Sequence, residues 1–315
     1  MQPKYNCVVL LGPTAVGKTA IAVKLADRFG WDVISADSRQ VYRGLDIASG
    51  KDLTEYEIGG KKIPFHLIDV VSLNEEYNLF SFQRDFFDTF NALRSQNKMA
   101  FVAGGTGMYL DCIMRNYELP CVPENLEQKT ELEKKTLDEL SHILISMKPN
   151  LHNKTDLLLK DRVIKALQIE LYKASPAGAE DHERLSQRKK ITAFVIGTTL
   201  NRTDLYESIE IRLKKRVEQG LIEEVESLAK EYSLERIERL GLECRWISLY
   251  LKGKIASKED MLIKLCTEIK RFAKRQETWF RGMEKKGVKI HWLPHDKSIQ
   301  VRYLTAAELV ERFVL

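Results

Sequence analysis

Short apolar runs alternate with segments of helical periodicity over the first 115 residues, and this pattern returns near residue 191. Residues 5–11 end in a continuous apolar run, which is typical of a strand buried on both faces, and residues 18–29 carry apolar side chains at helical spacing. Further strand patterns are "WDVISADS", "MAFVAGGTGMYL", which breaks at Gly104-Gly105, and "ITAFVIGTTL". Apolar strands that alternate with helices predict an α/β fold with a parallel sheet covered on both faces.

The pattern changes after residue 115. The stretches "LEQKTELEKKTLDELSHILI" and "KDRVIKALQIELYKA" have helical periodicity and many charges, and no strand pattern separates them. "SPAGAED" is typical of a turn, and the next strand follows it. We therefore predict a catalytic core of residues 1–115 and 183–315, interrupted by a helical insert over residues 116–182. Beyond residue 204 the core is mostly helical, apart from a short strand at "VKIHWL".

The composition restricts the class of protein. The 315 residues are 44% hydrophobic and 30% charged, which is ordinary for a soluble globular protein, and a net charge of +5 permits a nucleic-acid partner without requiring one. The five cysteines are widely spaced, which favours a reducing compartment over a disulfide framework or a zinc site. No apolar run approaches the ~18 residues of a membrane span. The first strand leaves no room for a signal peptide, so we expect a cytoplasmic protein without a membrane partner.

A phosphate-binding loop is the most specific motif. It follows the pattern G-x-x-x-x-G-K-[ST] between a predicted strand and a predicted helix. Its backbone N–H groups point inward at phosphate, Lys18 and the helix dipole add positive potential, and the Thr19 hydroxyl can reach Mg²⁺. The motif predicts binding of a di- or triphosphate but does not identify the compound. It consists of Gly12, Pro13, Thr14, Ala15, Val16, Gly17, Lys18 and Thr19.

The position of the carboxylates favours one type of chemistry. A P-loop hydrolase or kinase usually carries an Asp on a neighbouring strand to hold Mg²⁺, whereas "MAFVAGG" ends in glycines. The available carboxylate is Asp37, at the end of "VISADS", where parallel sheets gather their ligands. An Asp at such a place is often a turn former, but beside a phosphate loop it can act as a general base. This combination suits attack on a carbon whose leaving group is diphosphate.

Five motifs, in order, resemble those of the tRNA dimethylallyltransferases (tRNA isopentenyltransferases). They are "GPTAVGKT", "DSRQVYRGLDI", "FHLID", "GGTGMYL" and "AKRQETWFR", and the likeness runs from about residue 8 to residue 293. The resemblance implies a P-loop-kinase-like core with a helical insert. It also implies transfer of a dimethylallyl group from dimethylallyl diphosphate to the exocyclic amine of the adenine 3′ of the anticodon in tRNA. We expect no obligatory protein partner.

The resemblance also assigns roles to individual residues. Residues 12–19 hold the diphosphate of the reactant, with Mg²⁺ at Thr19. Asp37 takes a proton from the adenine amine, and Thr106 lies beside the reaction centre. Arg212 is matched to a residue that contacts the diphosphate. Ser38, Arg39 and Gln40, together with Asp37, are matched to residues around the flipped adenine. In the insert, the residues matched to contacts with the anticodon arm of tRNA are Arg162, Lys165 and Lys129.

The chain departs from the family pattern at four places, none of which removes an assigned chemical group. "DIASGKD" and "GLECRW" replace the usual motifs. Ser208 replaces a frequent arginine, and Asp161 replaces a frequently polar or basic residue. Without the resemblance, the charges of Arg162 and Lys165 would indicate only a solvated helix face. His66 indicates a structural hydrogen bond, and Trp279 and Phe280 indicate core positions.

Three alternative functions differ in what they leave unexplained. A prenyltransferase acting on free adenine nucleotides has no need of a large charged insert. A small-molecule kinase conflicts with the missing Asp and with the later motifs. A non-enzymatic RNA-binding module leaves an intact phosphate loop with an adjacent Asp unexplained.

Overall fold

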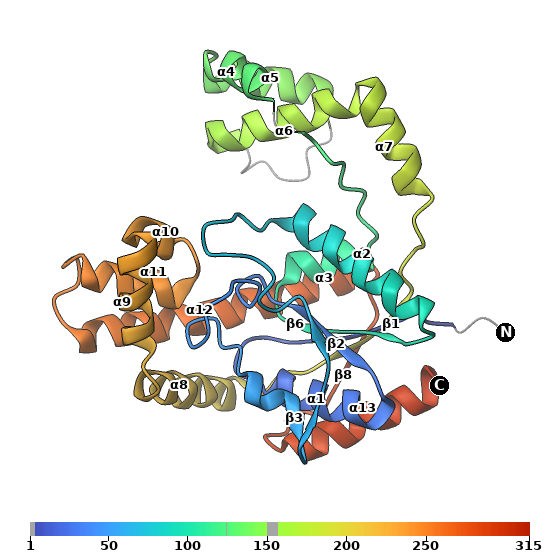
Figure 1. Cartoon of the computed structure of the whole chain (residues 1–315), viewed down its shortest axis with the longest axis vertical. Helices are drawn as coiled ribbons and strands as arrows, with labels where there is room; N and C mark the ends of the chain where they lie inside the picture. The colour runs from blue at the N-terminus through green and yellow to red at the C-terminus, as the bar shows by residue number, and fades with distance from the viewer. Residues whose placement is uncertain (1–3, 124, 150–156) are drawn as a thin grey trace. The chain divides into compact units, whose positions relative to one another are not determined.

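Residues 4–123, 125–149 and 157–315 are described by a computed structural model, which divides into two compact units (Figure 1). One unit joins the chain up to Asn116 with Ile191–Leu315, and the other is Tyr117–Lys190. In the described part of the chain, no helix is both long enough and apolar enough to cross a membrane.

The first unit is built on a six-stranded parallel sheet with the order β5-β2-β6-β1-β7-β8. Each predicted strand is confirmed, while β5 has two residues and was not predicted, because so short a run carries no periodicity. Leu11 lies level with Gly104 and with Gly197, so the central strands end together. The strands are β1 (Cys7–Leu11), β2 (Asp32–Ala36), β5 (Phe65–His66), β6 (Ala100–Gly104), β7 (Ala193–Gly197) and β8 (Ile290–Trp292). A separate antiparallel pair is β3 (Glu57–Ile58) and β4 (Lys61–Lys62).

Helices cover both faces of this sheet, as the unbroken apolar strands predicted. Val8 and Leu10 point to the face covered by α1 (Lys18–Phe29) and α13 (Ile299–Phe313). Val9 and Leu11 point to the other face, which is covered by α2 (Leu79–Ser95), α3 (Gly107–Met114) and α12 (Lys258–Lys285). This alternation follows from the two-residue period of a strand. The result is the predicted α/β core with two apolar layers.

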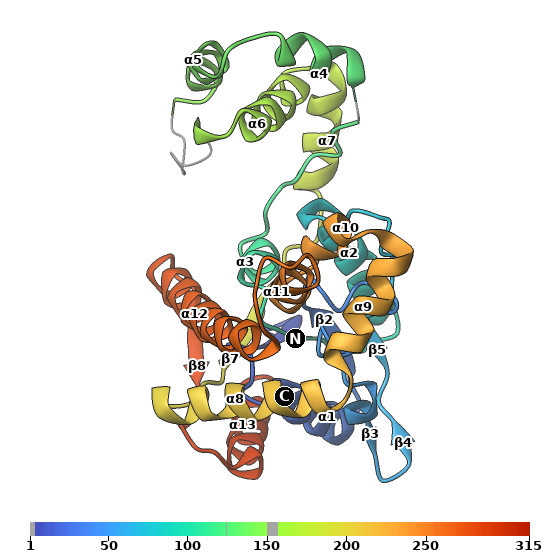
Figure 2. The same ribbon diagram turned by 90° about the vertical axis from the view of Figure 1, so that its left-hand side faces the viewer.

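A group of helices extends this unit after β7. They are α8 (Arg202–Glu218), α9 (Leu221–Tyr232), α10 (Leu234–Glu238) and α11 (Leu242–Leu251), and a short 3-10 helix, η1 (Leu53–Tyr56), precedes β3. Side-chain caps fix where α8 and α12 begin, because Asn201 and Ser257 each accept a hydrogen bond from a backbone N–H of the first helical turn. Figure 2 shows α8 and α12, which contact each other.

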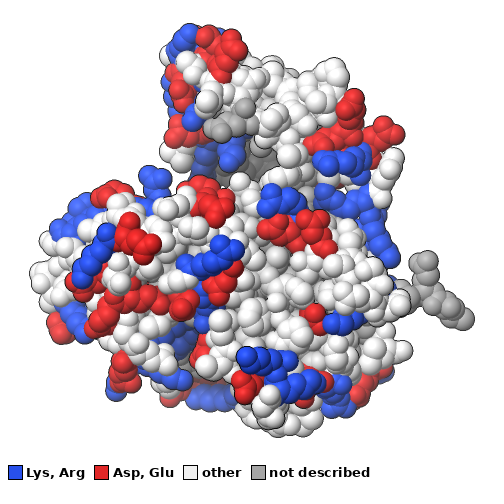
Figure 3. All heavy atoms as spheres, viewed as in Figure 1, with Lys and Arg blue, Asp and Glu red and all other residues white. Residues whose placement is uncertain are grey.

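The second unit has a small core of its own. It contains α4 (Leu126–Glu133), α5 (Leu137–Met147), α6 (Lys160–Lys173) and α7 (Pro176–Ser186). The apolar cluster formed by α4, α5 and α6 consists of Leu132, Leu140, Leu144, Val163, Ile164 and Leu167. Figure 3 shows positive and negative side chains interspersed on this unit rather than one continuous basic area on the face in view.

The predicted end of the insert at residue 182 was wrong, because "SPAGAED" starts a helix. Ser175 is the N-cap of α7 and accepts a hydrogen bond from the N–H of Gly178. Pro176 occupies the first turn, where a backbone N–H has no helical partner to lose. Residue 182 therefore lies within α7, and the compact unit continues to Lys190.

Two glycine substitutions test the packing of the sheet. A Cβ on Gly104 would lie 2.3 Å from the backbone oxygen of Ala36 on the neighbouring strand. We expect Gly104→Ala to lower the free energy of unfolding by ~1–3 kcal/mol, because paired backbone cannot move aside. A Cβ on Gly282 in α12 would meet no atom within 4 Å. The matched variant Gly282→Ala should raise stability by ~0.5–1 kcal/mol. Denaturant titration measures both, and equal effects of the two variants would contradict this account.

Candidate functional site

A pocket of about 540 Å³ lies at the carboxyl ends of β1, β2 and β6. Its walls come from the phosphate loop, from the segments after β2 and β6, and from α8 and α12. The predicted residues that line it are Thr14, Ala15, Gly17, Lys18, Thr19, Asp37, Ser38, Arg39, Gln40, Thr106 and Arg212. Residues far apart in the chain thus meet where parallel sheets bind ligands.

The backbone of the phosphate loop turns through unusual conformations. Ala15 and Gly17 both have a positive φ, of 63° and 75°. A Cβ on Gly12 would lie 2.1 Å from the carbonyl oxygen of Thr198, so this close approach requires glycine. Gly17 precedes α1 without a side-chain cap. The first N–H groups of α1 are therefore available to an anion, with the helix dipole behind them.

Arg302 of α13 supports the backbone of the phosphate loop. Its side chain is buried, and Nη1 donates to the carbonyl oxygen of Val16 at 2.6 Å and to the hydroxyl of Thr198 at 2.8 Å. Burial lowers the pKa of Arg302, since a buried cation loses its hydration. Sequence reasoning missed this residue, although an arginine among the apolar positions of "VRYLTAAELV" is a usable signal.

Gln276 of α12 also holds the phosphate loop in place. Its Oε1 accepts a hydrogen bond from the N–H of Thr14 at 2.9 Å, and its Nε2 donates to the carbonyl oxygen of Gly105 at 2.8 Å. Arg212 of α8 donates from Nη1 to the Thr14 hydroxyl at 3.0 Å. Gln276 is buried, and the sequence pattern did not predict its bridging role.

Positive charge is concentrated at this loop. Burial is the main cause that lowers the pKa of Lys18 to about 7, the neighbouring Arg212 lowers it further, and Asp37 opposes the shift. Lys18 donates a hydrogen bond to the carbonyl oxygen of Pro13. Desolvation also lowers the pKa of Arg212. A bound anion would relieve the repulsion between these two side chains.

Asp37 and Thr106 are fixed by local hydrogen bonds. Oδ1 of Asp37 accepts from the N–H of Arg39 at 2.9 Å, which is the turn expected for an Asp after a strand. The Thr106 hydroxyl accepts from the N–H of Ser38 at 3.0 Å, and the Thr106 N–H donates to the carbonyl oxygen of Ala36 at 3.1 Å. The ends of β2 and β6 are thereby tied together beside the phosphate loop.

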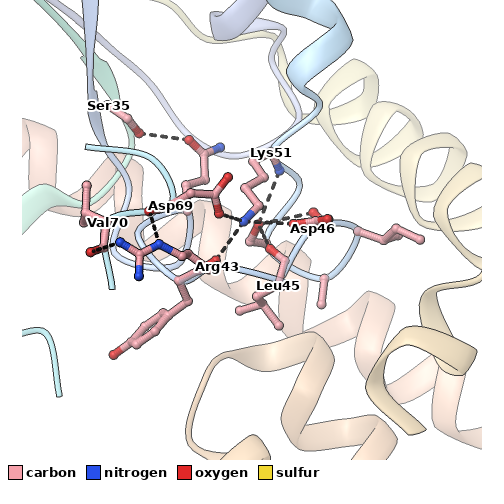
Figure 4. Close-up of polar contacts among 12 residues, drawn as sticks. Ser35, Arg43, Leu45, Asp46, Lys51, Asp69 and Val70 are labelled. Carbon is pink, nitrogen blue, oxygen red and sulfur yellow. Dashed lines mark hydrogen bonds and ion pairs between the residues drawn. The ribbon is translucent and has the colours of Figure 1, made fainter. Parts of the chain in front are cut away.

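Arg39 and Gln40 are each held from a different element. Nη1 of Arg39 pairs with Oε2 of Glu243 at 2.8 Å, and its guanidinium lies 5.1 Å from the ring centre of Phe272. Oε1 of Gln40 accepts from the hydroxyl of Ser35 at 2.9 Å (Figure 4). Both side chains therefore have fixed positions in the wall of the pocket.

The loop in "DIASGKD" forms another wall, and the buried Lys51 anchors it. Lys51 forms ion pairs with Asp46 at 2.9 Å and with Asp69, and it donates to the carbonyl oxygen of Tyr42 (Figure 4). Glu224 of α9 accepts hydrogen bonds from three consecutive backbone N–H groups of the same loop, at residues 46–48. Contacts within the protein thus fix the shape of this wall.

Outside the pocket, the structure confirms some structural expectations and corrects one. His66 bonds Asp32 at 3.0 Å, as expected of a structural histidine. Phe280 is buried in the core, as expected. The expectation that Trp279 is a core residue was wrong, because it is 38% exposed and packs against the backbone of Gly107.

The three residues matched to tRNA contacts lie in the second unit. Arg162 and Lys165 are exposed on α6, on the side away from the buried Val163 and Leu167. Lys129 lies 3.8 Å from Glu133 of its own helix. Their roles stay predictions, as do the roles assigned to the residues that line the pocket.

Comparison with known proteins gives a consistent result. The family model described as "IPP transferase" matches residues 40–283, and the model described as "Isopentenyl transferase" matches residues 5–63. The "tRNA dimethylallyltransferase 2" of Treponema denticola is 47% identical over 93% of this chain and 97% of its own length. The "tRNA dimethylallyltransferase 1" of Syntrophus aciditrophicus is 44% identical over 92% of this chain and 94% of its own length.

Solved structures agree with this result. The full-length tRNA isopentenylpyrophosphate transferase of Bacillus halodurans has a TM-score of 0.67 at 27% identity, covering 98% of this chain and 97% of that chain. A eukaryotic dimethylallyltransferase structure has a TM-score of 0.77 at 21% identity, covering 97% of this chain and 78% of that one, and shows likeness of fold alone.

The lowered pKa of Lys18 predicts proton uptake when diphosphate binds. With a pKa of about 7, Lys18 is mostly neutral at about pH 8 in the free protein, and a bound anion raises its pKa. Calorimetry in buffers of different ionisation enthalpy should show more proton uptake at about pH 8 than at about pH 6, where Lys18 is already charged. In Lys18→Met, the titration of diphosphate itself is the remaining source of proton uptake. The same proton balance in this variant and the wild type would contradict the assignment.

Proposed function

The chain belongs to the IPP transferase family of tRNA dimethylallyltransferases, and we propose that it transfers a dimethylallyl group from dimethylallyl diphosphate to the exocyclic amine of the adenine 3′ of the anticodon in tRNA. The observation that carries the proposal is one pocket in which Asp37 lies close enough to Lys18 of the phosphate loop to raise its pKa. A base and a diphosphate site thus face the same space.

The diphosphate end favours departure of the leaving group. The allylic C–O bond breaks, and both its electrons leave with the diphosphate. Backbone N–H groups at the start of α1, with Lys18 and Arg212, offset the charge that develops there. The loop backbone that carries these N–H groups is held in place by Arg302 at Val16 and by Gln276 at Thr14. The reorganisation that water would need is therefore avoided.

The acceptor end supplies the base. An aromatic amine is a weak nucleophile, and Asp37 takes its proton as the new C–N bond forms. Thr106 binds the backbone on either side of Asp37, at Ala36 and at Ser38. The carboxylate of Asp37 also accepts a hydrogen bond from the N–H of Arg39, so it keeps its direction. Arg39 over Phe272 offers a flat surface to a base. An adenine reaches this pocket only when it is turned out of the anticodon loop.

The residues at the phosphate loop fit Mg²⁺. Desolvation, with Asp52 beside it, raises the pKa of Glu55. Arg212 and Lys215 oppose that shift, and a hydrogen bond from Thr19 opposes it less strongly. The Thr19 hydroxyl and nearby carboxylates are hard oxygen ligands, and Mg²⁺ is typically held by few protein oxygens together with the phosphates of the substrate. We propose that Thr19 holds the ion. Bound Mg²⁺ would neutralise charge on the diphosphate.

The acceptor is RNA rather than a free nucleotide. The second unit folds around a core of its own and carries Arg162 and Lys165 on an exposed helix face. A mononucleotide would leave this unit without a role. Incubation with dimethylallyl diphosphate and bulk tRNA, followed by nucleoside analysis, should yield prenylated adenosine.

We expect Asp37→Asn to lower turnover at least ~10²-fold, the usual effect of losing a positioned base. The amide keeps the size of the side chain and still accepts the hydrogen bond from Arg39. Diphosphate affinity, measured by calorimetry, should remain that of the wild type. Near-normal turnover would remove Asp37 from the mechanism.

Binding of tRNA should weaken steeply with salt, with a log–log slope of about −0.7 to −0.9 per phosphate contacted. We expect Arg162→Ala with Lys165→Ala to weaken binding and flatten this slope, since fewer counterions are released. The matched control is Lys134→Ala with Lys135→Ala, which removes the same charge near the start of α5. Efficient transfer to AMP, unaffected by the first double variant, would overturn the tRNA assignment.

A further inference from the structure

One face of α8 turns toward the pocket and carries more positive charge than sequence reasoning assigned. Its pocket-lining residues are Ser208, Arg212, Lys215, Arg216 and Gln219, which follow helical spacing. Nη1 of Arg216 lies 3.3 Å from Oε1 of Glu243. Its Nη2 is buried and has no hydrogen-bond partner among the described residues. A buried donor without a partner is costly.

The guanidinium groups of Arg212 and Arg216 converge on one point. A Cβ on Gly50 would lie 1.4 Å from Nη2 of Arg216 and 2.4 Å from Nη2 of Arg212. Gly50 also has a positive φ of 67°, so this wall accepts only glycine without strain. Burial lowers the pKa of Arg216 to about 10, with Arg212 as the second cause and Glu243 opposing.

The carboxylate that pairs with Arg216 also pairs with a second cation. Glu243 of α11 is buried and is shared, with Oε2 on Arg39 at 2.8 Å and Oε1 on Arg216. Arg212 uses a neutral partner, the Thr14 hydroxyl in the phosphate loop. Asp37 attracts Arg216 through space, and it raises the pKa of Arg216 less than Glu243 does. Glu243, Glu55 and Asp37 attract Arg212 through space. The buried Nη2 of Arg216 still lacks a partner beside this second cation, which indicates a site for an anion.

Resting on the proposed function, we propose that Arg216 is a further diphosphate-binding residue and that Glu243 is its positioning residue. Nη2 of Arg216 donates to a phosphate oxygen beside Arg212, which already contacts the phosphate loop. Glu243 holds Arg216 with one oxygen and Arg39 with the other. It therefore fixes the leaving-group end of the pocket relative to the acceptor end.

Calorimetric titration of the full chain with inorganic diphosphate and Mg²⁺ tests the role of Arg216. We expect Arg216→Gln to bind at least ~10-fold more weakly, the usual scale for losing a hydrogen bond from a charged group. Arg216→Lys should fall in between, because it keeps the charge but loses the fork that reaches Glu243 and ligand together. The control Lys214→Gln removes a charge from an exposed position of α8 and should bind as the wild type does.

Kinetic and binding constants, together with thermal melting, distinguish a positioning role of Arg216 and Glu243 from an effect on folding. Arg216→Gln should raise KM for dimethylallyl diphosphate and leave the Kd for tRNA unchanged. Glu243→Gln should alter both constants, because it releases Arg39 as well as Arg216. Thermal melting without ligand identifies any variant that is misfolded, and Arg216→Lys then replaces Arg216→Gln in the comparison.

Two results would overturn the inference. One is wild-type diphosphate affinity in Arg216→Gln. The other is a loss of tRNA affinity with diphosphate affinity unchanged, which would assign Arg216 to an RNA phosphate. Failure of the proposed function has a different signature: the wild type binds diphosphate through Arg216 but produces no prenylated adenosine.

Discussion

The phosphate loop keeps its shape because buried polar side chains hold its backbone from both sides, and the rest of the site depends on this. Arg302 binds the carbonyl of Val16 from α13, and Gln276 binds the N–H of Thr14 from α12. Both side chains are buried, so water competes little for these bonds. The loop can therefore present its N–H groups to an anion without collapsing onto its own carbonyl groups.

Because the loop is fixed, cationic side chains lie close together around it although they repel one another. Lys18, Arg212 and Arg216 all have lowered pKa values, and burial is the first cause for each. The close approach of these cations is unfavourable, and a bound diphosphate would offset it. Stabilisation aimed at a departing diphosphate, rather than at a resting substrate alone, is what speeds bond cleavage.

The acceptor side depends on a different set of restraints. Thr106 ties the segment after β2 to the end of β6, which sets the position of Asp37. Lys51 and Glu224 shape the loop opposite. Glu243 connects the two ends through Arg39 and Arg216. The chemistry of transfer thus rests on contacts between segments that are distant in the chain.

The sequence by itself determined five of the six strands of the sheet, α1, the phosphate loop and the place of Asp37, since these follow from local periodicity and from a short motif with its flanks. It also indicated a helical insert, although α7 was mistaken for a turn. Only the tertiary structure decided which distant side chains complete the site. Arg216, Glu243, Gln276 and Arg302 lie on helices whose periodicity marks a face but not its partner. Their roles arise from packing at the end of the sheet, which no local pattern encodes.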